Sequence, residues 1–317
     1  MDVDGRKQNP AMAMRRIVPN MNYQHAFHAG NFADVHKHVV LTRILDYLRQ
    51  KPAAFRVIDT HAGAGRYDLL GLQATRSGEW RDGIGRLFST PRSGASKIDP
   101  AQALIAPYLD IIAALNPGGA LRSYPGSPLI VKALLRRQDR LIACELEPGA
   151  ATALKAALHG DARAKALAID GWVALFANIP PKERRGLIVI DPPYEESGEF
   201  ARLPETLAQA HRKWPTGIYL LWYPIKTREA PDALARRLRR LSLPKILRCE
   251  VSLGPPRSDG ALAGSGLIII NPPFPLEREL RVILPTLTGL LAPVRAPMVT
   301  PVVKPLDAYR LDWLSGA

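Results

Sequence analysis

The sequence predicts an α/β fold with a doubly wound sheet, and three observations carry that prediction. Short apolar runs alternate with helical patterns over residues 141–270. An early strand at Arg56–Asp59 is followed at once by a turn with Gly63 and Gly65. Acidic residues end three of the apolar runs, where sheets of this kind bind nucleosides. At 317 residues and 47% hydrophobic, the chain can bury a core as one large domain or as a domain with an insertion.

The elements follow in order along the chain. Residues 1–20 are polar, so we expect disorder there, with Met21 as a second candidate for the start of translation. Residues 32–49 place apolar side chains on one helix face. The interval of about 68–140 is far longer than a crossover helix needs, which predicts an inserted, mostly helical subdomain. After it we expect strands at 141–145, 165–169, 187–190, 217–223, 246–253 and 266–270, and helices at 150–158, 172–177, 203–213 and 231–241.

The chain therefore divides into three parts. A disordered extension covers residues 1–20, a single domain covers 21–292, and a tail covers 293–317. The tail is rich in proline, which cannot donate a backbone hydrogen bond, so we expect a strap on the surface.

The charge balance predicts a polyanionic partner. Lys and Arg outnumber Asp and Glu by 43 to 29, which gives a net charge of +14 and a pI near 10. Nucleic acid is the commonest partner of such a protein, and the alternative is a charge that serves solubility alone.

Cysteine usage and hydropathy bear on the cellular location of the protein. Cys144 and Cys249 both lie in predicted strands, so we expect small core residues rather than a disulfide framework or a zinc site. No apolar run reaches the 18–20 residues or so that span a membrane, and the N-terminus lacks the apolar core of a signal peptide. We expect a cytoplasmic protein.

The most informative motif is Asp191-Pro192-Pro193-Tyr194, which directly follows the apolar run 186–190. The exocyclic amine of adenine is a poor nucleophile because its lone pair is delocalised into the ring. The Asp191 carboxylate and the Pro192 carbonyl can accept its N–H bonds and return the lone pair to nitrogen, while the prolines hold that carbonyl still. Tyr194 can stack on the base. The motif is typical of amino-group methyltransferases that use S-adenosylmethionine; the alternative is an ordinary turn after a strand.

A second copy, Asn271-Pro272-Pro273-Phe274, follows the run 266–270. The order of strands favours the first copy. A doubly wound sheet places the fourth strand beside the first, near the switch point where ligands bind, and the last strand far from it. We therefore expect Asp191 to be functional and Asn271 to end a structural strand.

A cofactor site is predicted at the carboxyl ends of the first three strands. The glycine turn lets the backbone approach a ligand closely. Glu145 can accept both hydroxyl protons of a ribose, and Asp170-Gly171 can meet an adenine edge. A third glycine at the spacing required by dinucleotide sites is absent, since Asp68 stands there. Each acid alone could equally be a turn or helix cap.

Two further clusters have competing interpretations. Five of the seven histidines precede residue 62. No cysteine and no paired carboxylates lie at the spacing of metal ligands, so we do not expect a metal site there. We expect these histidines to form hydrogen bonds or to pack in the core, and packing is favoured for His36. Ten Lys or Arg and only two acids lie between Arg212 and Arg248. Arg236 and Arg239 on the predicted helix are candidate phosphate contacts, with a solvated helix face as the alternative.

Several stretches together resemble the bacterial 23S ribosomal RNA adenine-N6 methyltransferase family of the J type. The resemblance covers about residues 21–292. It rests on the stretches 22–38, 59–67, 124–128, 191–195, 217–224 and 266–273.

The resemblance implies a class I, Rossmann-like, S-adenosylmethionine-dependent methyltransferase fold with a helical insertion. It implies methylation of one adenine of 23S ribosomal RNA to N6-methyladenosine, in naked RNA or an assembly intermediate, by a protein that we expect to be a monomer. Asp191, Pro192 and Tyr194 would form the catalytic site, and Tyr23 would contact the RNA. The implied cofactor contacts are Lys37, His38, His61, Gly63, Ser127, Glu145, Asp170, Gly171 and Asp191.

Three alternatives stay open at this point. A DNA adenine-N6 methyltransferase would use the same slot, because the slot holds the base and not its sugar. A non-catalytic nucleic-acid-binding protein linked to DNA uptake or use could keep the fold, although Asp191, Tyr194 and Glu145 argue against it. An NAD-dependent oxidoreductase would need the missing third glycine.

Overall fold

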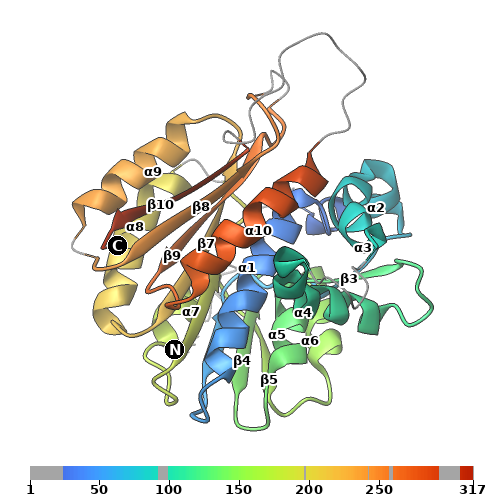
Figure 1. The fold of residues 1–317 in the computed structure, drawn as a ribbon. Coiled ribbons are helices and arrows are strands. Elements are labelled where there is room, and N and C mark those ends of the chain that lie inside the picture. Colours follow the sequence, from blue (N-terminus) through green and yellow to red (C-terminus); the bar gives the residue numbers. More distant parts are fainter. Residues whose placement is uncertain are drawn as a thin grey trace, which may run out of the picture.

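A computed structural model describes residues 24–91, 99–195, 198–241, 243–256, 260–292 and 308–316. Eight strands form one sheet in the order β10-β8-β9-β7-β6-β1-β4-β5, which runs through the middle of the molecule (Figure 1). Its strands are β1 Arg56–Asp59, β4 Arg140–Glu145, β5 Ala164–Ala168, β6 Gly186–Ile190, β7 Ile218–Ile225, β8 Ile246–Ser252, β9 Gly264–Ile270 and β10 Tyr309–Ser315. The predicted α/β fold is confirmed.

Strand direction determines which ends of the sheet meet. The strands β5, β4, β1, β6 and β7 are parallel neighbours, with Asp59 in register between Ala143 and Val189. Strand β9 is antiparallel to both β7 and β8, and β10 is antiparallel to β8. The carboxyl end of β9 therefore lies beside the amino ends of the parallel strands, on the opposite side of the sheet from the carboxyl ends of β1 and β6.

The expected surface strap is wrong for part of the tail. Residues 309–315 form β10, the edge strand of the main sheet, with Leu311 opposite Cys249. The prolines dominated the prediction, but they all precede residue 306, and Tyr309–Ser315 has the aromatic and aliphatic side chains that suit a sheet edge. The expected disorder of residues 1–20 and the prolines of 293–305 fall outside the described residues.

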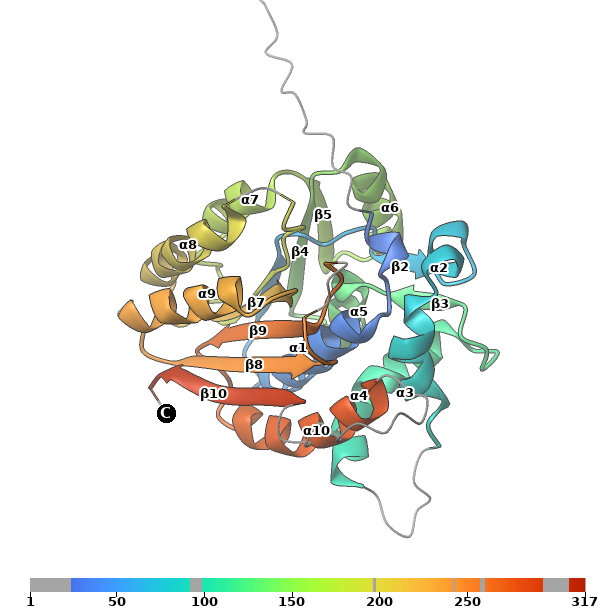
Figure 2. The ribbon, with the colours of Figure 1, turned by 90° about the horizontal axis from the view of Figure 1, so that it is seen from above.

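Helices cover both faces of the sheet. Figure 2 shows the two groups on either side of it. Alternate strand residues such as Val57 and Leu187 point to one group, while Ile58 and Ile188 point to the other, so the central strands β1 and β6 are buried on both faces. The first group is α1 Phe32–Arg49, α5 Ser127–Leu134, α6 Pro148–Leu158 and α10 Leu276–Leu291; the second is α7 Gly171–Ala177, α8 Glu199–Lys213 and α9 Glu229–Arg240.

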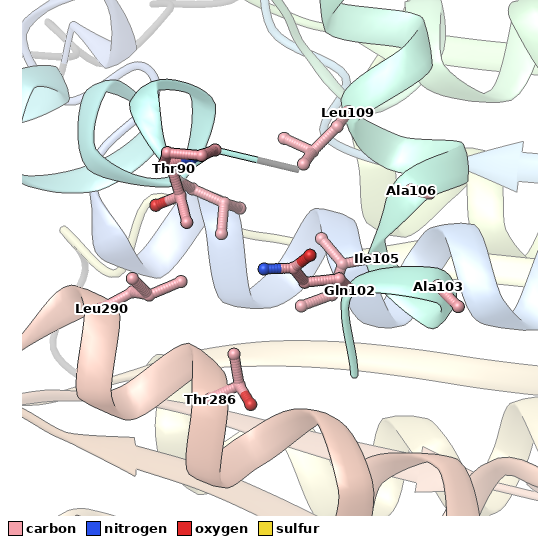
Figure 3. A pocket seen from close by; sticks show the side chains of 10 residues that line it. Thr90, Gln102, Ala103, Ile105, Ala106, Leu109, Thr286 and Leu290 are labelled. Atoms are coloured by element: carbon pink, nitrogen blue, oxygen red, sulfur yellow. The ribbon is translucent and has the colours of Figure 1, made fainter. Parts of the chain in front are cut away.

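The long interval between β1 and β4 forms an additional layer outside α1 and α10. Its elements are β2 Arg66–Asp68, α2 Leu72–Ser77, a π-helical turn at Arg81–Gly85, α3 Arg86–Ser89, α4 Pro100–Leu115 and β3 Ser123–Pro125. Tyr108 and Ile112 of α4 belong to the same buried cluster as the sheet, so this layer shares the main core. A cavity of about 190 Å³ lies between α3, α4 and α10, with Leu109 and Leu290 in its wall (Figure 3).

Candidate active site

Two adjoining cavities lie at the carboxyl ends of the parallel strands. One has a volume of about 1120 Å³ and is lined by the glycine turn, Glu145 and Asp170; we call it the glycine cavity. The other, of about 1060 Å³, is lined by Phe32, Phe200 and Trp222; we call it the aromatic cavity. The side chains that line both are His25, Lys37, Asp191, Pro193, Tyr194, Glu199 and Lys226.

A cluster of charged side chains occupies the junction of the cavities. The Lys37 ammonium lies 3.0 Å from Asp34 Oδ1 and also contacts Asp191 Oδ2. Asp34 Oδ2 accepts hydrogen bonds from the Gly30 amide (2.9 Å) and from His25 Nε2 (3.0 Å). Lys37 follows Asp34 by three residues on α1, so both project from one helix face towards the end of β6. The Asp191 carboxylate is thereby fixed in position from a helix 154 residues earlier in the sequence.

The charges in this cluster reinforce each other. Burial by itself would lower the pKa of Lys37, but Asp191 and Asp34 outweigh it and raise that pKa above its usual value. Burial would raise the pKa of Asp34, and the charges of Lys37 and His25 instead hold it well below its usual range. Lys37 is thus a cation between two carboxylate groups, and only 5% of its side chain is exposed.

The loop after β6 holds an aromatic ring between the cavities. Tyr194 has a positive φ of 55°, which turns its side chain back against the sheet. Its hydroxyl donates to the Trp222 carbonyl at 2.6 Å, and its ring packs 4.8 Å from Phe200 and 5.7 Å from Trp222. Pro192 lines the glycine cavity alone, whereas Pro193 lines both. Asp191, Pro193 and Tyr194 therefore lie together at the junction, while Pro192 lies on the side of the glycine cavity.

The glycine turn and Glu145 form one wall of the glycine cavity. Gly63 has a φ of +62°, and a Cβ there would meet the Tyr67 hydroxyl at 2.2 Å, so only glycine fits. The Gly63 amide donates to Glu145 Oε2 at 2.8 Å, and the amides of Leu146 and Glu147 donate to Oε1. Burial nevertheless raises the pKa of Glu145, since these bonds offset it only in part. Oε1 therefore has both lone pairs in use, whereas Oε2 keeps one lone pair that a further donor can use.

Asp170, Gly171 and His61 form the opposite wall. Asp170 Oδ1 caps α7 by accepting from the amides of Trp172 and Val173, both at 2.9 Å. A Cβ at Gly171 would lie 2.2 Å from the Thr60 carbonyl oxygen, so this turn needs glycine. His61 bonds to Thr60 Oγ1 at 2.8 Å, and burial lowers its pKa to about 4. Asp170 is thus a helix cap, as one interpretation expected, and it also lines the cavity; its contact with a cofactor stays a prediction.

His38 has a buried nitrogen without a partner. His38 Nδ1 bonds to the Tyr124 hydroxyl at 2.7 Å, while Nε2 is buried and unpaired among the described residues. Burial lowers the pKa of His38 to about 3, so the ring is neutral. His38 and the buried Ser127 both line the glycine cavity.

His36 points away from the cavities. It bonds to Ser265 Oγ (3.0 Å) and to Cys249 Sγ (3.3 Å) inside the core, and burial lowers its pKa to about 3. Its role is internal packing, as the mid-helix position suggested. Cys144 and Cys249 are buried free thiols, and within the described residues no group of His, Cys, Asp or Glu is arranged to hold a metal. In the same residues no helix is long and apolar enough to cross a bilayer.

Three predicted positions lie away from the junction. The Asn271 side chain donates to the carbonyls of Pro215 and Gly217, both at 2.8 Å, at the opposite edge of the sheet. The sequence analysis placed Asn271 far from the site because β9 was expected to be the last strand, and this reason is wrong. Strand β10 follows β9 in the chain, and Asn271 is far from the site because β9 runs antiparallel to β7. Arg236 and Arg239 lie on the second half of α9, which runs back from the site, and Tyr23 falls outside the described residues.

The sequence analysis missed three residues that the structure brings to the junction. Asp34 and His25 lie within the stretch that carries the family resemblance, but neither follows a strand. The spacing of Asp34 and Lys37 on one helix face was a signal that could have found the first. Trp222 lies within β7, and no local pattern shows that its ring lines a cavity.

Comparisons with known proteins identify the family. The family model described as "Ribosomal RNA large subunit methyltransferase D, RlmJ" matches residues 52–300. This chain belongs to that family. It is 40% identical over 273 residues to the "Ribosomal RNA large subunit methyltransferase J" of Escherichia coli (strain K12), which covers 86% of this chain and 95% of that protein. The protein of the same name from Haemophilus influenzae is 39% identical over 274 residues, with the same coverage.

A solved structure supports the fold over nearly the whole length. A crystal structure of a Legionella pneumophila protein has a TM-score of 0.77 and 34% identity, covering 92% of this chain and 99% of that one. The family membership agrees with the resemblance found in the sequence.

Proposed function

We propose that this protein transfers a methyl group from S-adenosylmethionine to the N6 amine of one adenine in 23S ribosomal RNA. The observation that carries the proposal is the junction itself. Asp191, Pro193 and the packed ring of Tyr194 line both cavities, and Pro192 lines the glycine cavity beside them. The curated relatives named as large-subunit ribosomal RNA methyltransferases support the same function.

The glycine cavity fits S-adenosylmethionine, whose part in the reaction is to supply an electrophilic methyl group. Glu145 would accept from the cofactor's ribose at Oε2, and Asp170 from the adenine amine at Oδ2, since these oxygens keep unused lone pairs. The unpaired His38 Nε2 is suited to bond the polar amino-acid end of the cofactor. Lys37 lies at the boundary, but its ammonium is committed to Asp34 and Asp191.

The target adenine would enter the aromatic cavity, out of its stack, at a cost of a few kcal/mol. Tyr194 would lie against its face, and Asp191 with the Pro192 carbonyl would accept its two N–H bonds. Asp34, Lys37 and Asp191 together carry one net negative charge. That charge stabilises the positive charge that grows on nitrogen during transfer, and Lys37 keeps the Asp191 carboxylate from rotating away.

The test is transfer of tritium from labelled S-adenosylmethionine to total RNA from a strain that lacks this gene, compared with RNA from its parent. We expect label only in large-subunit RNA of the deficient strain, recovered as N6-methyladenosine. We infer that the protein acts in the cytoplasm, because ribosomal RNA is found there in bacteria. Equal labelling of the two RNAs would contradict the proposal. Label in duplex DNA instead would favour the DNA methyltransferase alternative.

A further inference from the structure

Two leucine side chains are exposed at the tip between β2 and α2. Leu72 is 82% exposed and Leu70 is 56% exposed. Single exposed apolar residues are common and need no explanation, but two on one short tip are a feature to account for.

The tip is rigid although its leucines are exposed. Leu69 between β2 and the tip is fully buried, and its amide donates to the Arg122 carbonyl at 2.8 Å. The Leu70 amide donates to Asp68 Oδ1 at 2.9 Å, and the Thr75 hydroxyl donates to the Leu70 carbonyl at 3.2 Å. A side chain presented on a fixed backbone loses little conformational entropy when it binds a partner.

The tip lies beside the openings of both cavities. Gln73, next to Leu72, lines the glycine cavity, and Glu79, just beyond the end of α2, lines the aromatic cavity. The Ser77 hydroxyl donates to the Phe27 carbonyl, which ties α2 to the turn that carries His25. Figure 2 shows α2 at the outer edge of the molecule, next to the segment that leads into α1.

Arginines surround the leucines, and their charges are not neutralised locally. Arg66, Arg76 and Arg81 are exposed, and none forms an ion pair with a carboxylate among the residues that the structure describes. Two of the nearby acids have partners of their own, since Glu79 bonds to His28 and Asn31 and Asp82 pairs with Arg86. Asp68 accepts from the Leu70 amide and keeps its charge, so the three arginines leave a net positive charge at the tip.

The basic helix α9 differs in this respect. Arg237 pairs with Glu205 at 2.6 Å, Arg239 lies 3.5 Å from Asp312, and Arg228 pairs with Asp232 and Glu250. Much of its positive charge is offset by acids on neighbouring elements, so it attracts a polyanion less than its sequence suggests.

We propose that the β2–α2 tip binds the RNA strand beside the target adenosine. Leu70 and Leu72 pack against base faces that lose their neighbour when the target leaves its stack, as apolar side chains do when inserted between bases. Arg66, Arg76 and Arg81 contact the adjoining phosphates. The proposal rests on the proposed RNA substrate and names a surface that positions it.

The first test replaces both leucines in the full-length protein, as Leu70→Ser with Leu72→Ser. We expect KM for unmodified large-subunit RNA to rise by about tenfold or more, because apolar contacts of two leucines are lost. Cofactor affinity, measured by calorimetry without RNA, should be unchanged. Phe274→Ser is the matched control, since Phe274 is 96% exposed at the opposite edge of the sheet.

The second test replaces Arg66→Gln with Arg76→Gln and measures RNA binding over a range of salt concentrations. Loss of two phosphate contacts should reduce the slope of log affinity against log salt by about 1.4 for single-stranded RNA. The matched control is Arg237→Gln with Arg239→Gln on α9, which removes the same charge from two ion-paired arginines and should change the slope less.

The outcomes distinguish a failure of the tip proposal from a failure of the proposed function. Wild-type affinity and slope in both tip variants would overturn the proposal. A defect seen with ribosomal particles but absent with naked RNA would assign the tip to a protein partner, which also overturns it. A wild-type protein that binds large-subunit RNA but never methylates it would refute the proposed function, while the binding comparison would still decide the role of the tip.

Discussion

Strands β6 and β9 are followed by similar motifs, Asp191–Tyr194 and Asn271–Phe274, yet the two motifs have different surroundings. After β6, Asp191 contacts the buried ammonium of Lys37, and Tyr194 packs among aromatic rings. After β9, Asn271 donates to two backbone carbonyls of a neighbouring turn, and Phe274 is 96% exposed. Both loops use a positive φ, at Tyr194 in the first and at Asn271 in the second.

The difference arises from strand direction. Strand β6 is parallel to β1, so its end joins the edge where the cavities lie. Strand β9 is antiparallel to β7, so the motif that follows it lies at the opposite ends of the parallel strands. The sequence motif alone therefore does not make a functional site. It can form one after β6, where a cation and a cavity lie beside it, and not after β9. The amide at 271 serves the chain itself by closing a turn.

The largest effect should come from exchanging the polar residue in each motif. Asp191→Asn should reduce turnover by about 10²–10³-fold, because an acceptor aimed at the developing positive charge is lost. Cofactor binding should persist. Asn271→Asp should turn over near the wild-type rate per folded molecule. Single-turnover methyl transfer measures both, and an active Asp191→Asn protein would remove the carboxylate from the mechanism.

An intermediate effect is expected for the aromatic residues. Tyr194→Ala should lower kcat/KM for RNA by about 10–100-fold, which corresponds to a stacking contact of about 1–3 kcal/mol. Tyr194→Phe keeps the ring and loses only the bond to the Trp222 carbonyl, so it should retain most of the activity. Phe274→Ala should match the wild type. Equal losses in Tyr194→Phe and Tyr194→Ala would show that the hydroxyl, not the ring, matters.

The smallest effect concerns stability at the second motif. Asn271→Ala should lower the free energy of unfolding by about 1–2 kcal/mol, because two carbonyls lose their donor. Asn271→Gly should cost less, since glycine adopts the positive φ of 53° without strain. Denaturant titration compares the variants. If both unfold like the wild type, the turn after β9 does not depend on this amide.

The sequence was informative about the site wherever function follows a strand end. Asp59, Glu145, Asp170 and Asp191 all terminate apolar runs, and parallel strands bring such ends together by geometry alone. The contact between Lys37 and Asp191 could not be found locally, because the two residues lie 154 positions apart and no local period relates them. The ion pair of Arg239 with Asp312 was not foreseen, because Asp312 belongs to an edge strand that the prolines concealed.

The sequence by itself determined the identity and order of most strands and helices, the inserted segment and the acids at strand ends. It could do so because hydrophobic periodicity and turn chemistry act over a few residues. Only the tertiary structure decided that β9 runs against its neighbours, that α1 delivers Lys37 to Asp191, and that Leu70 and Leu72 stay exposed beside the cavities. Those facts depend on which surfaces pack together, and packing is a property of the whole chain.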